Sequence, residues 1–166
     1  MCGGVNGRHS RSYGCIAYSS RMARIEILHK AAVTAIDYRC TSGPDEAAFP
    51  EVHVRHSLSY VRKGTFGCTC RGRVLDLVPG SLFIGHPGDE YICSHSHHRG
   101  GDECLSFQFD ADVVAEIAPD AQWRAGMVPP LPELVILGSV GRWRPNAAAA
   151  WRSMKSVCCS VHDSHA

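Results

Sequence analysis

Four glycines recur at equal intervals within a stretch of short apolar segments, at Gly64, Gly72, Gly80 and Gly88. Two of them follow proline, and the other two lie beside lysine or arginine, so each has the setting of a turn. The segments between them are rich in Val, Leu, Ile, Phe and Tyr. Turns spaced by roughly 8–12 residues are typical of antiparallel sandwiches and barrels and leave too little room for helices. The sequence therefore predicts an all-β fold with a cavity as its natural site.

Alternation of apolar and polar residues marks the individual strands. In the segment before residue 110, Leu105, Phe107 and Phe109 recur at every second position, so we expect their face to be buried and the alternate residues to point the other way. One or two further strands are expected between residues 25 and 40, of which Val33–Tyr38 has the better pattern. The remaining expected strands are 56–62, 65–70, 74–78, 82–85, 90–95 and 103–109.

The chain divides into a flexible arm (1–24), a β-barrel (25–110), a helical segment (111–138) and an irregular tail (139–166). Asp110 or Asp112 can cap a short helix that ends near Ala118. Pro132 can begin a second short helix that runs to Leu137. At 166 residues this is one domain with less regular ends.

Charge and composition exclude several classes of partner and location. The net charge is only +1, so no global field favours nucleic acid or a membrane surface. No apolar run is long enough to span a membrane, and residues 1–12 lack the apolar core of a secretory signal. We therefore expect a cytoplasmic protein with no membrane partner. Nine cysteines, an odd number, then indicate reduced thiols rather than a disulfide framework.

Two groups of side chains could carry metal chemistry. The first comprises Glu51, His53 and His56. In the second, Cys93 and His95 share one face of a strand, and the following loop could bring in further ligands. Imidazole and thiolate together suit zinc or another divalent metal, although this is not the spacing of a zinc finger, and a polar surface loop would show the same residues. The candidate metal ligands are Cys93, His95, His97 and Cys104.

Three stretches resemble a known family: residues 56–67 (HSLSYVRKGTFG), 77–85 (LVPGSLFIG) and 87–91 (PGDEY). They are similar to the cupin barrel, and in particular to the N-terminal sensing domain of AraC-type transcriptional regulators. Residues 93–98 (CSHSHH) and 101–107 (GDECLSF) resemble one subgroup of these regulators. The resemblance, which covers about 33–137, implies a double-stranded β-helix, or jelly roll, that binds a small effector, followed by short helices that form a homodimer.

The same resemblance implies a C-terminal DNA-binding domain with two helix-turn-helix units, one helix of each reading the major groove. After Leu137 the chain is too short for such a domain, so DNA binding is expected only through a part that is missing here. The composition of the chain changes near Ser139. Our hypothesis is that a frameshift or an early stop in a longer gene explains this change. The expected effector contacts are His53, His56, Tyr60, Arg62, Phe66, Phe83 and Tyr91. For the aromatic residues among them, packing in the core is the alternative role.

A stand-alone metal-binding cupin, such as a dioxygenase or isomerase, is the rival interpretation. Enzymatic cupins hold their metal with a His-x-His pair, a Glu and a later His. This chain lacks His-x-His near residues 51–56 and has Tyr91 where the later His falls. A rearranged set of His53, His56 and either Cys93 or His95 stays open, as does a ligand-free interaction module with a filled barrel. We expect a sensor that is not an enzyme and requires no cofactor.

Overall fold

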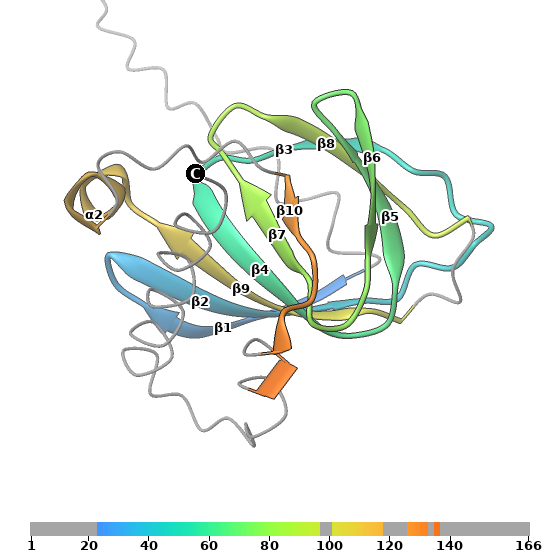
Figure 1. Cartoon of the computed structure of the whole chain (residues 1–166), viewed down its shortest axis with the longest axis horizontal. Helices are drawn as coiled ribbons and strands as arrows, with labels where there is room; N and C mark the ends of the chain where they lie inside the picture. The colour runs from blue at the N-terminus through green and yellow to red at the C-terminus, as the bar shows by residue number, and fades with distance from the viewer. Residues whose placement is uncertain (1–22, 97–100, 118–125, 133–134, 137–166) are drawn as a thin grey trace, which may run out of the picture.

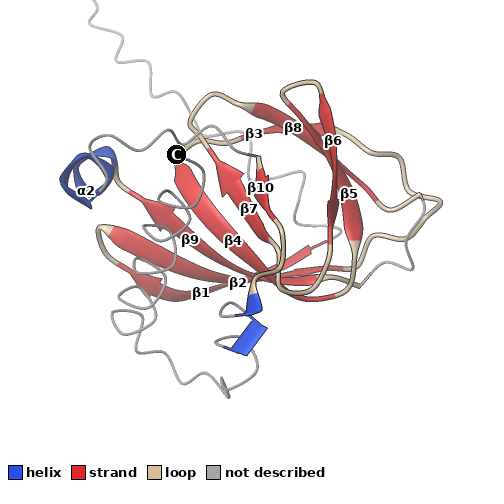
Figure 2. Ribbon diagram, in the orientation of Figure 1, coloured by secondary structure: helices blue, strands red, loops and turns tan. Residues whose placement is uncertain are grey.

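The computed structural model describes residues 23–96, 101–117, 126–132 and 135–136. Within these residues the chain is mostly β, with one short helix among the assigned elements, which confirms the mostly β class expected from the sequence (Figures 1 and 2). The expected strands from residue 56 to residue 109 agree with the observed ones to within one residue at each end. In chain order the elements are β1 (Ala23–Lys30), β2 (Val33–Cys40), β3 (Pro50–Val52), β4 (His56–Lys63), β5 (Phe66–Cys70), β6 (Arg73–Leu77), β7 (Leu82–Gly85), β8 (Glu90–Ser94), β9 (Glu103–Phe109), α2 (Ala111–Ile117) and β10 (Met127–Val128).

The strands form two sheets, and every pairing in them is antiparallel. The larger sheet has the order β1-β2-β9-β4-β7-β10, and the smaller one has the order β3-β8-β5-β6. In Figure 1 the smaller sheet lies beyond the β7 and β10 end of the larger one. The crossovers between distant strands are consistent with the expected jelly roll, while the hydrogen bonds define two sheets rather than one closed cylinder.

Two apolar clusters lie on opposite faces of the larger sheet. Leu105, Phe107 and Phe109 are buried, as the period-two pattern predicts, and they pack with Val114 of α2 on the outer face. The alternate residues of β9 face the smaller sheet, where Cys104 joins the second cluster. We call the first group the outer core (buried members Ala35, Leu58, Leu82, Leu105, Phe107, Phe109 and Val114) and the second the inter-sheet core (Val61, Phe66, Cys68, Cys70, Leu75, Leu77, Phe83 and Cys104).

The four regularly spaced glycines occupy turns, as predicted. Their φ angles are +76° at Gly64, +71° at Gly72, +94° at Gly80 and +86° at Gly88, a region that residues with a Cβ rarely adopt. Gly64 also lies against the backbone of Asp102: a Cβ at this position would be 2.6 Å from the Asp102 Cα. Glycine is therefore required at Gly64 both by the turn and by the close approach.

Some boundaries differ from the expectations. β1 begins at Ala23, two residues inside the expected arm, and β3, which begins at Pro50, is not among the expected strands. The helix expected after Asp110 is present as α2 up to Ile117, the last described residue of this stretch. At the second expected helix, the Val135 amide donates to the Leu131 carbonyl at 3.0 Å. The tail 139–166, the rest of that helix and residues 1–22 lie outside the described residues.

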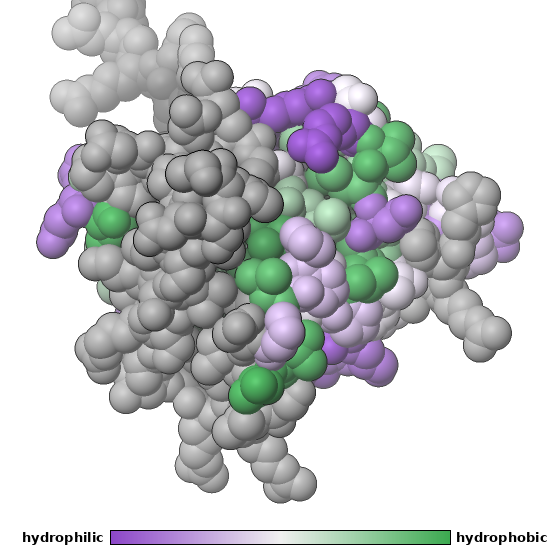
Figure 3. All heavy atoms as spheres, in the orientation of Figure 1, coloured by the Kyte–Doolittle hydropathy of each residue, from purple (hydrophilic) through white to green (hydrophobic). Residues whose placement is uncertain are grey.

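The surface shown in Figure 3 mixes polar and apolar residues over the described part of the chain. The exposed apolar side chains include Val54, Val74 and Ile136. A search of the described residues finds no helix with the length and apolar character needed to cross a membrane.

Candidate functional site

A cavity of about 240 Å³ lies between the two sheets. Side chains alternate between the two faces of a strand. In the larger sheet, the residues next to those of the outer core therefore point inward and line the cavity. Ser106, for example, lines the cavity while its neighbour Phe107 is buried in the outer core. The lining comprises Ile25, Ile36, Tyr38, Cys40, Ser57, Ser59, Phe83, Cys104, Ser106 and Gln108 on one side, and Glu51, His53, Phe66, Tyr91, Cys93, His95 and Asp102 on the other.

Stacked rings form one wall of this cavity. The His53 and Tyr91 rings are stacked with centroids 4.2 Å apart, and Phe83 meets Tyr91 edge-on at 5.5 Å. Burial lowers the pKa of His53 to about 4, against a smaller opposing effect of the Asp89 carboxylate. The imidazole is therefore neutral at pH 7. Its Nε2 atom is buried and has no hydrogen-bond partner among the described residues.

Polar side chains line the opposite part of the cavity. The Ser59 hydroxyl donates to Ser106 Oγ at 2.9 Å across the β4–β9 pair, and Ser57 and Gln108 lie beside them in register. Across the cavity, burial raises the pKa of the Glu51 carboxyl, and a hydrogen bond with Tyr91 offsets part of that increase. The cavity therefore offers an aromatic surface together with hydroxyl, amide and carboxyl groups that can form hydrogen bonds.

Three ligating side chains converge at one end of the cavity. Cys40 ends β2, His95 follows β8 and Asp102 precedes β9, and all three are buried. His95 Nε2 lies 2.8 Å from Asp102 Oδ1 and 3.8 Å from Cys40 Sγ. The Ser42 amide donates to Cys40 Sγ at 3.4 Å. We call Cys40, His95 and Asp102 the Cys-His-Asp cluster; their ligating atoms all lie within 4.8 Å of one another.

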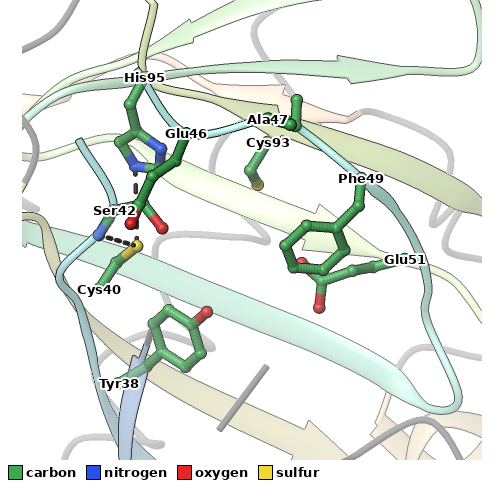
Figure 4. Close-up of a pocket in the computed structure, with 10 residues that line it drawn as sticks. Tyr38, Cys40, Ser42, Glu46, Ala47, Phe49, Glu51, Cys93 and His95 are labelled. Atoms are coloured by element: carbon green, nitrogen blue, oxygen red, sulfur yellow. Dashed lines mark hydrogen bonds between the residues drawn. The ribbon is translucent and has the colours of Figure 1, made fainter. Parts of the chain in front are cut away.

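Figure 4 shows two members of the cluster, Cys40 and His95, in a smaller neighbouring pocket of about 40 Å³ that shares both residues with the main cavity. In this view the His95 ring points at the Cys40 sulfur, and Glu46 and Phe49 belong to the loop that borders the pocket. Burial raises the pKa of the Cys40 thiol, although the hydrogen bond from Ser42 acts in the opposite direction.

The four metal ligands expected from the sequence are only partly brought together. His95 belongs to the Cys-His-Asp cluster, and His97 lies outside the described residues. Cys93 and Cys104 line the cavity but are not members of that cluster. A hydrogen bond with Cys68, its cross-strand neighbour, together with burial raises the pKa of Cys93, and burial raises the pKa of Cys104 to about 12.

Sequence reasoning missed Cys40 as a ligand because it lies 55 residues before His95. Only the antiparallel pairing of β2 with β9 brings it beside residue 102. Asp102 belongs to the same polar stretch as His95, and its position directly before a predicted strand was the signal that could have found it.

Of the seven residues expected to contact an effector, four line the cavity: His53, Phe66, Phe83 and Tyr91. The other three lie elsewhere because they occupy the even-numbered positions of β4, whereas Ser57 and Ser59 face inward. His56 meets the His86 ring edge-on at 4.9 Å, Tyr60 packs against the outer core, and Arg62 forms an ion pair with Asp37.

In the part of the chain that the structure describes, the positions that the resemblance assigns to the ligands of an enzymatic cupin do not hold the usual set. Tyr91 lies where the later His falls, and it hydrogen-bonds to Glu51 in the range 51–56 that lacks His-x-His. His56, a member of the rearranged alternative, does not line the cavity. Among the described residues, the Cys-His-Asp cluster is the one group with three ligating atoms in mutual reach.

Comparison with solved structures finds weak similarity to small cupin-type proteins. A cupin superfamily protein from Desulfitobacterium hafniense is 15% identical, with a TM-score of 0.44 over 53% of this chain and 78% of that one. KdgF from Halomonas sp. is 20% identical, with a TM-score of 0.43 over 55% and 84% of the two chains. A putative mannose-6-phosphate isomerase from Ralstonia eutropha is 13% identical, with a TM-score of 0.45 over 54% and 85%. No curated protein matches the sequence.

Comparison with protein families gives a more extensive match. The model of the AraC-like ligand binding domain matches residues 35–157. This range begins within β2, contains β3 to β10, and includes every member of the Cys-His-Asp cluster. Because the match covers well over half of the chain, the protein belongs to the family of AraC-like ligand-binding domains.

Proposed function

We propose that this chain is the effector-sensing domain of an AraC-type transcriptional regulator, and that it binds a small molecule in the cavity between its two sheets. The supporting observation is the cavity itself, which has a volume of about 240 Å³ and a mixed aromatic and polar lining. Sites for drug-sized ligands have volumes of roughly 300–1,000 Å³, so the effector is a compact molecule. As a regulator of transcription, the protein would act in the cytoplasm.

The lining suggests the chemical class of the effector. The His53 Nε2 atom is buried and has no partner in the described part of the chain, and a ligand that hydrogen-bonds to it removes the cost of leaving it unpaired. The Ser59 and Ser106 hydroxyls offer further hydrogen bonds on the opposite side. A small molecule with a flat apolar face toward Tyr91 and several hydroxyl, amide or carbonyl groups meets these requirements.

The route from effector to regulation passes through β9. Its Ser106 side lines the cavity, while Phe107 and Phe109 pack with Val114 of α2 in the outer core. A ligand that binds more tightly when β9 is in one position therefore also favours the corresponding position of α2. The size of this shift is limited by the difference in the ligand's affinity for the two positions. We propose that the helical segment 111–138 forms the interface of a homodimer, so that the shift reaches the DNA-binding part of the regulator.

A thermal-shift screen of the full chain against a library of small polar metabolites tests the sensing role. An effector present at 100 times its Kd stabilises the native state by about 2.7 kcal/mol and raises the unfolding midpoint. The S106F variant, which fills the cavity, should lose this response. The matched T69F variant, which adds the same ring at an exposed position of β5, should keep it.

Other outcomes of the same screen would contradict the proposal. A molecule that is stabilising but is also chemically converted would indicate an enzyme. A library without any stabilising molecule would indicate a filled interaction module. Sedimentation velocity tests the dimer separately, because a monomer at all concentrations would rule out the role proposed for segment 111–138.

A further inference from the structure

The geometry of the Cys-His-Asp cluster distinguishes between two kinds of chemistry. In a nucleophile–base–acid triad, the nucleophile and the acid contact opposite nitrogens of the imidazole. Here Cys40 Sγ and Asp102 Oδ1 both approach the same atom, His95 Nε2. The imidazole cannot take a proton from the thiol on one side while the carboxylate orients it from the other. The arrangement is instead that of three ligand atoms within 4.8 Å of one another, close enough for one metal ion to bind all three.

The separations of the donor atoms fit a tetrahedral ion. Zinc bonds of about 2.3 Å to sulfur and about 2.0–2.1 Å to nitrogen or oxygen give donor–donor distances of roughly 3.3–3.6 Å at tetrahedral angles. The observed distances from His95 Nε2 are 3.8 Å to Cys40 Sγ and 2.8 Å to Asp102 Oδ1. Shifts of about half an ångström would bring these two distances to the tetrahedral values, and Cys40 Sγ and Asp102 Oδ1 lie within 4.8 Å of each other.

The backbone and the neighbouring side chains hold the three donors in place. The Cys40 amide donates to the Asp102 carbonyl at 2.9 Å, which fixes the ends of β2 and β9 relative to each other. Gly64 packs against the Asp102 backbone, and the Phe66 ring lies 6.1 Å from the His95 ring. The Ser42 amide donates to Cys40 Sγ, an interaction that stabilises a thiolate.

We propose that Cys40 Sγ, His95 Nε2 and Asp102 Oδ1 bind a zinc ion, with the fourth coordination position open to the cavity. A thiolate with an imidazole and a carboxylate favours zinc over magnesium or calcium. Three protein ligands and one exchangeable position are typical of zinc sites that contact a small molecule. All three ligands line the cavity, so a bound ion can contact its occupant directly. On binding, the Cys40 thiol proton passes to the buffer, and the His95 imidazole keeps its proton on Nδ1.

Cobalt(II), a coloured substitute for zinc, tests the site in the full chain. We expect one equivalent to give the strong visible bands of a four-coordinate ion and a sulfur-to-cobalt charge-transfer band of one thiolate. C40S should lose the charge-transfer band, whereas the matched C93S variant should keep it. D102N should weaken zinc binding by at least the roughly 10–100-fold typical of lost outer-shell partners.

The proposal is overturned if C40S keeps the charge-transfer band, or if C93S or C104S abolishes it. Cadmium-113 NMR of the unmodified chain gives an answer that does not depend on whether a variant folds. A resonance in the range of one thiolate ligand supports the site, and one in the range of two or more thiolates rejects it. Azide tests the open position: it should shift the visible cobalt bands, and unchanged bands would show that the fourth position is closed.

Discussion

Gly64 links the most prominent feature of the sequence to the cluster at the end of the cavity. It is one of the four evenly spaced turn glycines, yet it differs from Gly72 in its surroundings. A Cβ at Gly72 would meet nothing within 4 Å, whereas a Cβ at Gly64 would lie 2.6 Å from the Asp102 Cα. The same residue type therefore meets one requirement at Gly72, a positive φ, and two at Gly64.

We predict that G64A destabilises the protein more than G72A does. Both variants place a Cβ at a positive φ, which costs roughly 1–2 kcal/mol. G64A adds an overlap with the Asp102 backbone, and overpacking of this kind costs about 1–3 kcal/mol more. Urea denaturation followed by circular dichroism measures both variants against the unmodified chain. If both variants lost the same free energy of unfolding, the β4–β5 turn would be able to move away from Asp102 without an energetic cost.

The buried ring of His53 leads to a prediction about the stability of the protein at acidic pH. Burial lowers the pKa of its ring from 6.5 to about 4, so between these values the unfolded chain binds a proton that the folded chain does not. The stabilising effect of the neutral ring is complete above pH 6.5 and is lost as the pH falls toward 4. Allowing for solvent screening at a half-buried ring, the loss is about 2 kcal/mol.

The H53F variant tests this effect because it keeps a ring against Tyr91 and removes the titrating group. The free energy of unfolding of the unmodified chain should fall more steeply than that of H53F between neutral pH and about pH 5. Carboxylates that protonate in the same range affect both proteins and cancel in the difference. Parallel pH profiles would mean that His53 binds a proton in the folded state as readily as in the unfolded one.

At the scale of the elements, β9 is the strand that joins the cavity to the outer core. Its odd-numbered residues Leu105, Phe107 and Phe109 pack in the outer core, and its even-numbered residues face the cavity. It pairs with β2 on one side and β4 on the other, so it lies in the interior of the larger sheet. Neighbouring positions on this strand should therefore have different roles when they are mutated.

We expect F107A to act mainly on stability and S106A mainly on binding. Phe107 is fully buried, and its truncation costs about 3–5 kcal/mol. S106A removes the hydroxyl that Ser59 contacts and costs about 0.5–1.5 kcal/mol, but it alters the lining of the cavity. Thermal melts with and without a molecule from the screen separate the two effects. If S106A binds that molecule as tightly as the unmodified chain does, Ser106 is not a contact.

The strands could be predicted because their signals are local. Turn glycines and alternation within β4 to β9 determine both the boundaries and the inward face. β3 and β10 contain only three and two residues, too few for a periodic pattern. Tyr60 and Arg62 do not line the cavity, for a different reason: aromatic or charged character does not identify a pocket residue, and both lie on the outward face of β4.

The Cys-His-Asp cluster contains a contact that could not be predicted from the sequence. His95 was expected because it lies among other possible ligands, but Cys40 belongs to a strand far away in the chain. Its contact with His95 depends on the register of β2 with β9, in which Arg39 is opposite Glu103. Register over such a separation is set by the packing of whole sheets, which a single sequence does not reveal.

At the scale of the whole molecule, the two apolar clusters share three strands of the larger sheet. β4 contributes Leu58 to the outer core and Val61 to the inter-sheet core, and β7 and β9 likewise contribute to both. The smaller sheet buries its apolar side chains only in the inter-sheet core. Loss of either cluster therefore exposes one face of the same three strands, which favours unfolding as one unit.

We predict that the described part of the chain unfolds in a single transition even when only the inter-sheet core is weakened. Leu77 in β6 is fully buried there, and L77A should cost about 2–5 kcal/mol. Native-state hydrogen exchange at increasing urea should show amides of β5 and β8 opening together with those of β2 and β9, in L77A as in F107A. If the smaller sheet instead opened first in L77A while β2 and β9 stayed protected, the two sheets would be separate cooperative units. The coupling between cavity and α2 would then need a route other than β9.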